Sequence, residues 1–193
     1  MTRVAVHACD LQRLEGLLFA RDPVRARIGP PEQFYDRVYT ERALATMEDQ
    51  DAAAEALQTL IFGPAPDKPL GRIHATVFRS IVETLCPRID DDVFGGSSLA
   101  TIRRIADHLN PQLGPGLSES VTGRRIAFVR LEEDPALAAY SYWTRDEMKQ
   151  FLRKYDEAGT NPGPVPPEHL RQLRDVWRGA LAQGPDALLV ITR

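Results

Sequence analysis

The chain has 193 residues, of which 43% are hydrophobic and 26% charged, a balance that is typical of a globular protein with a sizeable core and not of a disordered chain. Its formal net charge is -3, and its basic residues are scattered along the sequence, so we expect no nucleic-acid partner. We expect neither a signal peptide nor a membrane span, because no apolar run has the required length or flanks. These properties predict one cytoplasmic domain over residues 1–193 that contacts no membrane.

The N-terminal part of the sequence predicts a strand followed by helices. Residues 3–8 (RVAVHA) form a short run of apolar and β-branched side chains, which is typical of a strand. Asp10 is suited to cap a helix, and leucines follow it at helical spacing. Pro30-Pro31 predicts the start of another helix, because proline is tolerated in the first helical turn.

Three helices are predicted in the middle of the chain. The first covers about residues 51–62 and ends at a Gly-Pro pair. The second covers residues 72–85 and has an apolar stripe broad enough for a buried helix. Ser97 or Ser98 caps the third. Its inward-facing residues are Leu99, Ile102, Ile105, Ala106 and Leu109.

The C-terminal part predicts two strands and two helices. Residues 126–131 (IAFVRL) are expected to form a strand. Thr144 and Glu147 have the spacing of a capping box, which opens a helix. A Pro/Gly-rich linker at 159–167 precedes a leucine- and tryptophan-rich helix, and residues 187–192 (ALLVIT) form a final apolar strand.

These elements predict an α+β fold, mostly helical, with a small sheet of about three strands that includes both terminal strands. Strand 187–192 is apolar at nearly every position, which indicates burial on both faces. Terminal strands usually fray unless they are paired. We therefore expect strand 187–192 to lie in the interior of the sheet, beside strand 3–8.

The sequence lacks the common catalytic and cofactor motifs. No glycine-rich phosphate loop and no nucleophile elbow is present, so we expect no cofactor and incline against an enzyme. His7-x-Cys9 places two side chains on one face of a strand, with Asp10 directly after them, and this pattern is compatible with a metal or thiolate site. A buried cysteine beside a helix cap is the favoured interpretation, because no second ligand pair has diagnostic spacing. We expect no metal site.

Two groups of residues are candidates for binding. Asp90, Asp91 and Asp92 are adjacent acids that fit a solvated loop, a hard-cation site or an acidic rim for a basic partner. Tyr140 and Tyr142 are aromatic residues of the kind that carries binding energy at interfaces. Trp143, next to them, is expected to anchor the following helix by packing on Met148 or Phe151.

Several of these pieces occur together in one known group of proteins. They are the opening strand with its helix at Asp10, the run Leu57-x-x-Leu60-Ile61-Phe62-Gly63, the run Tyr142-Trp143-Thr144-x-x-Glu147-Met148, and the closing helix, Gly184 and apolar strand. In these features the chain resembles the YfbM-like group of small bacterial proteins and its actinobacterial relatives. The resemblance implies an α+β fold and a bacterial source. It supplies no catalytic residues, and residues 95–131 have no counterpart in it.

The absence of a catalytic pattern and the mildly acidic composition favour a non-catalytic protein-binding accessory or immunity-type module, whose partner is another protein. The alternative is an enzyme or small-molecule-binding protein whose site forms only in three dimensions. Its candidate groups are His7, Cys9, Asp10, His74, Asp92 and Tyr142. A third alternative is a structural or oligomer-forming role, and the sequence leaves the oligomeric state open.

Overall fold

The computed structural model describes residues 2–20, 50–97, 100, 126–132, 138–158 and 167–192. The chain divides into two compact units. Unit 1 consists of Met1–Cys9, Pro87–Ile126 and Ala138–Arg193, and unit 2 of Asp10–Cys86 and Ala127–Leu137. The sequence predicts a single domain over residues 1–193, and this division into two compact units does not test that prediction. The helices expected after Pro30-Pro31 and over about 99–109, and the linker expected at 159–167, lie outside the described residues apart from Ala100 and Pro167.

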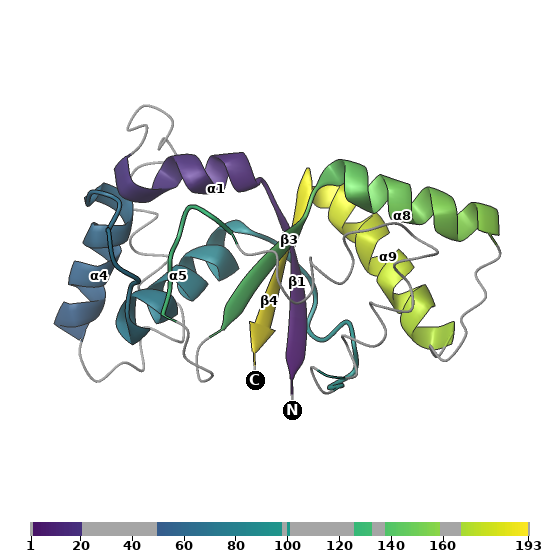
Figure 1. The fold of residues 1–193 in the computed structure, drawn as a ribbon, viewed down its shortest axis with the longest axis horizontal. Helices are drawn as coiled ribbons and strands as arrows, with labels where there is room; N and C mark the ends of the chain where they lie inside the picture. The colour runs from purple at the N-terminus through teal and green to yellow at the C-terminus, as the bar shows by residue number, and fades with distance from the viewer. Residues whose placement is uncertain are drawn as a thin grey trace. The chain divides into compact units, whose positions relative to one another are not determined.

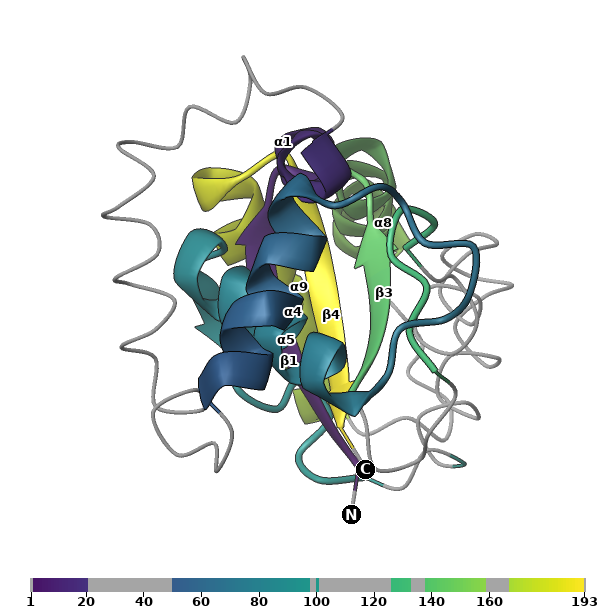
Figure 2. The ribbon, with the colours of Figure 1, turned by 90° about the vertical axis from the view of Figure 1, so that its left-hand side faces the viewer.

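Unit 1 is built on a four-stranded antiparallel sheet in the order β2-β1-β4-β3. Figures 1 and 2 show its strands β1, β4 and β3. Its strands are β1 (Arg3–Cys9), β2 (Arg88–Asp90), β3 (Ala139–Trp143) and β4 (Asp186–Thr192). β1 and β4 pair over their whole length, from Arg3 opposite Thr192 to Cys9 opposite Asp186, so the two termini lie side by side. This confirms the α+β class, the pairing of the terminal strands and the interior position of β4. The sheet has one strand more than expected.

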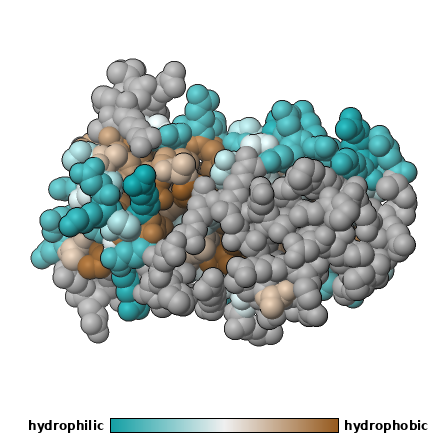
Figure 3. Space-filling view, viewed as in Figure 1, coloured by the Kyte–Doolittle hydropathy of each residue, from teal (hydrophilic) through white to brown (hydrophobic). Residues whose placement is uncertain are grey.

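One face of this sheet packs on two helices, α8 (Arg145–Ala158) and α9 (Pro167–Gln183). At the centre of the core, Trp143 stacks on Trp177 with ring centroids 4.6 Å apart and meets the edge of Phe151 at 5.9 Å. This confirms the expected packing of Trp143 on the helix that follows it. The outward side of α8 is hydrophilic (Figure 3). The buried core residues are Val4, Val6, Val93, Phe94, Trp143, Met148, Phe151, Leu170, Leu173, Val176, Trp177, Ala180, Ala187, Leu189 and Ile191.

A capping box fixes the transition from β3 to α8. The backbone N–H of Thr144 donates to Glu147 Oε2 at 2.8 Å, and the N–H of Glu147 donates to Thr144 Oγ1 at 3.4 Å. Both donors belong to the first turn of a helix, where backbone N–H groups have no partner within the helix itself. The capping box predicted from the sequence is therefore confirmed.

A β-bulge shapes the pairing between β1 and β2. Val6 pairs with Asp90 and His7 pairs with Arg88, so Ile89 is the extra residue. Ile89 packs closely on α9, because a Cβ added at Gly179 would lie only 3.0 Å from Ile89 Cγ2. The bulge therefore anchors β2 on α9 directly before the acidic segment.

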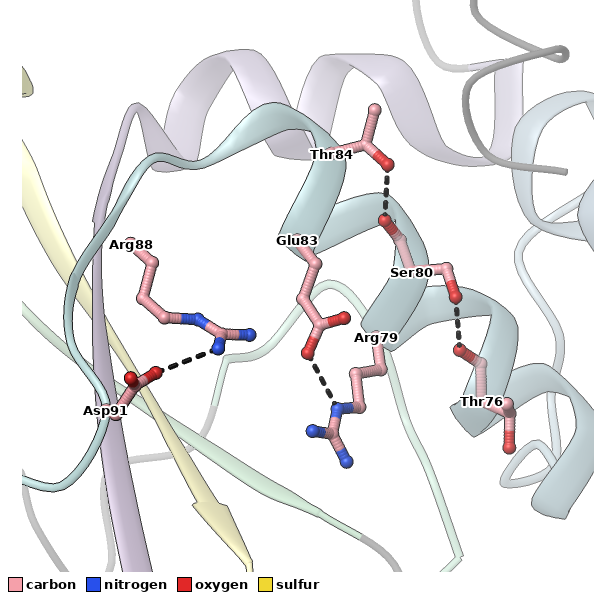
Figure 4. A network of polar contacts seen from close by, with 7 residues as sticks. All are labelled: Thr76, Arg79, Ser80, Glu83, Thr84, Arg88 and Asp91. Carbon is pink, nitrogen blue, oxygen red and sulfur yellow. Dashed lines mark hydrogen bonds and ion pairs between the residues drawn. The ribbon is translucent and has the colours of Figure 1, made fainter. Parts of the chain in front are cut away.

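Unit 2 contains helices α1 (Leu11–Leu17), α4 (Gln50–Phe62) and α5 (Arg72–Leu85), and the short 3-10 helix η1 (Leu18–Ala20). Asp10 caps α1 as expected, since its Oδ1 accepts the N–H of Arg13 at 2.9 Å. The inner stripe predicted for α4 is buried, and α5 covers the expected range. The hydroxyls of Ser80 and Thr84 each donate to the carbonyl one turn back along α5 (Figure 4).

Residues 126–131 do not form the expected strand. Only Leu131 takes part in β pairing, as an isolated parallel bridge to Leu70, in which Leu70 N–H donates to Arg130 and Glu132 N–H donates to Leu70. An apolar run becomes a strand only where a neighbouring strand accepts its backbone hydrogen bonds. Among the described residues, only Leu70 pairs with this segment, so no strand forms.

None of the described helices has both the length and the apolar character needed to cross a membrane.

Candidate functional site

Two of the three predicted binding acids are held by hydrogen bonds within unit 1. Asp90 Oδ1 accepts the N–H of Asp92 at 2.7 Å, and Asp92 Oδ1 accepts the N–H of Val4 at 3.4 Å. Gln172 on α9 donates to Asp90 Oδ2 and to the Asp92 carbonyl, at 3.4 Å each. The carboxylates of Asp90 and Asp92 therefore fix the turn that follows β2.

Asp91 differs from its neighbours because it points to solvent. Its side chain is 80% exposed and forms a 2.8 Å ion pair with Arg88, whose side chain is 45% exposed (Figure 4). An exposed ion pair of this kind contributes little stability, about 0–1 kcal/mol. Asp91 is thus a negative charge displayed on a backbone that its neighbours hold in place.

The acidic turn does not have the character of a metal centre. Within the described part of the chain, no group of three or more His, Cys, Asp or Glu residues is placed to hold a metal ion. Of the four carboxylate oxygens of Asp90 and Asp92, three already accept hydrogen bonds. A hard cation needs six or more oxygen ligands directed at one point, whereas these oxygens are directed at the backbone and at Gln172.

The predicted tyrosines lie at the opposite edge of the sheet. Tyr140 pairs with Val190 and Tyr142 with Leu188, and both side chains are on the face away from α8 and α9. Tyr140 is buried and Tyr142 is half-buried. β1 and β4 stand between β2 and β3, which separates the edge strands by roughly 14 Å at about 4.8 Å per strand. The acidic turn and the tyrosines therefore belong to different surfaces.

Three of the candidate groups for an enzyme share this second face of the sheet. His7 on β1 is opposite Leu188 on β4, which is in turn opposite Tyr142 on β3, so the three form one row across the strands. Cys9 lies two residues beyond His7 on the same face. The structure thus brings His7, Cys9 and Tyr142 together on one face.

The register also places Asp186, which was not among the predicted residues, directly opposite Cys9. The sequence signal for Asp186 is weak, because it is a single acid after Gly184-Pro185, where a helix-to-strand turn is expected. Only the pairing of two strands from opposite ends of the chain connects it to His7 and Cys9.

The remaining candidates have other positions. Asp10 caps α1, Asp92 binds the backbone of Val4, and His74 lies in the first turn of α5. Burial lowers the pKa of His74 below its ordinary value, and the negative charge of Glu55 partly opposes this shift. His74 is therefore biased towards the neutral form near neutral pH.

Fold and site together define an α+β protein with an antiparallel sheet, an ordered acidic turn at one edge, and His7, Cys9 and Tyr142 on one face of the sheet. Scans against protein-family models, curated proteins and solved structures found no match for the chain. The resemblance to the YfbM-like group stays a prediction.

Proposed function

We propose that this chain is a non-catalytic protein-binding module of the bacterial cytoplasm, of accessory or immunity type, and that it docks a basic partner protein at the turn Asp90–Asp92. The observation that carries the proposal is the exposed charge of Asp91 on a turn that Asp90, Asp92 and Gln172 hold in place. The net negative charge of the chain, -3, also favours a positively charged partner. The resemblance to the YfbM-like group supports the bacterial assignment and no more.

The order of this turn favours binding in a specific way. A loop that is already fixed loses little conformational entropy when a partner docks, so more of the interaction energy appears as affinity. Charges at the rim of an interface mainly raise the association rate and select a partner of opposite sign. Asp91 has both properties, because its backbone is held and its carboxylate reaches solvent.

Charge reversal at Asp91 tests this proposal. The partner is first isolated by affinity capture on the wild-type protein, and its binding is then measured at two salt concentrations. Asp91→Arg should weaken binding by about tenfold or more, mainly through slower association, and should reduce the salt dependence.

The matched control is Asp175→Arg on α9. The Asp175 side chain is 61% exposed and also pairs with an arginine, Arg174, at 2.8 Å, so both variants remove one exposed acid from an ion pair. Binding should survive the control substitution. Equal loss of binding in both variants, or no captured partner above background, would count against the acidic turn as a docking site.

The second candidate function is an enzyme or small-molecule-binding protein. It is favoured by the arrangement of His7, Cys9 and Tyr142 on one face of the sheet. The two functions are separable by mutation, because Asp91 lies beyond β2 whereas these groups lie on β1 and β3. Substitution of His7 should abolish a catalytic or ligand-binding activity, whereas docking at the acidic turn should not require its side chain.

A further inference from the structure

We draw no further inference here: the strongest candidate, the exposed surface of Phe62 and the proline-rich loop 63–69 at the C-terminal end of α4, supports no proposal because nothing in the structure shows what covers it.

Discussion

Deletion of residues 187–193 should leave a protein that is insoluble or molten. The deletion removes β4, the interior strand between β1 and β3, so both neighbours lose a backbone partner. It also removes four large aliphatic residues, Leu188, Leu189, Val190 and Ile191, each at most 6% exposed. Full burial of such side chains stabilises by roughly 1.5–3 kcal/mol each, so the loss is comparable with the whole stability of a domain, about 5–15 kcal/mol.

The measurement is the soluble fraction on expression, together with near-ultraviolet circular dichroism and dye binding by exposed apolar surface. Deletion of residues 192 and 193 alone is the control, because it keeps the buried residues of β4 and should cost little. A long deletion that expresses well and melts cooperatively near the full-length temperature would show that β4 is not part of the core.

Trp177→Ala should have the second-largest effect. Trp177 is fully buried and stacks on Trp143 at the centre of the core between the sheet and α8 and α9. Truncation of a buried tryptophan leaves a cavity and typically costs about 3–5 kcal/mol. Urea denaturation should show this loss as a lower midpoint with an unchanged slope.

Two further substitutions make the result for Trp177 specific. Trp177→Phe keeps an aromatic ring in the core. It also loses no hydrogen bond, because no acceptor for the indole N–H of Trp177 occurs among the described residues. This change should therefore lower the free energy of unfolding clearly less than the change to alanine. Arg178→Ala alters the next residue, whose side chain is 51% exposed, and should stay within about 0.5 kcal/mol of wild type. Equal effects of Trp177→Ala and Arg178→Ala would contradict the described core.

The sequence predicts those helices and strands whose pattern lies within their own residues. The helix over 72–85 has an apolar stripe, α8 has its capping box at Thr144, and the strand at 187–192 is apolar throughout. Each of these signals is local, so no knowledge of the neighbours was needed. The pairing of the first and last strands followed from one additional argument, that a terminal strand needs a partner.

The missed elements depend on contacts that are remote in the sequence. β2 has three residues, two of them charged, and exists because β1 offers it a pairing edge and α9 receives Ile89. β3 alternates Tyr140 and Tyr142 with Ser141 and Trp143, and its strand character comes from β4. Conversely, residues 126–131 have a strand-like sequence but only Leu70 beside them.

The same reason limits the prediction of the candidate site. The sequence shows Asp90–Asp92 as an acidic cluster. It does not show that Asp90 and Asp92 bind Gln172 and the backbone of Val4 while Asp91 points to solvent. His7 and Cys9 were visible as a pair, whereas Asp186 is separated from them by almost the whole chain.

Hydrogen exchange of the backbone amides tests the central structural claim most directly, namely that both terminal strands form the middle of the sheet. The amides of β1 and β4 that pair with each other should be among the slowest to exchange and should become exposed together with the α9 core. Rapid exchange along β4, while the amides of α9 remain protected, would contradict the sheet order and the site built on it.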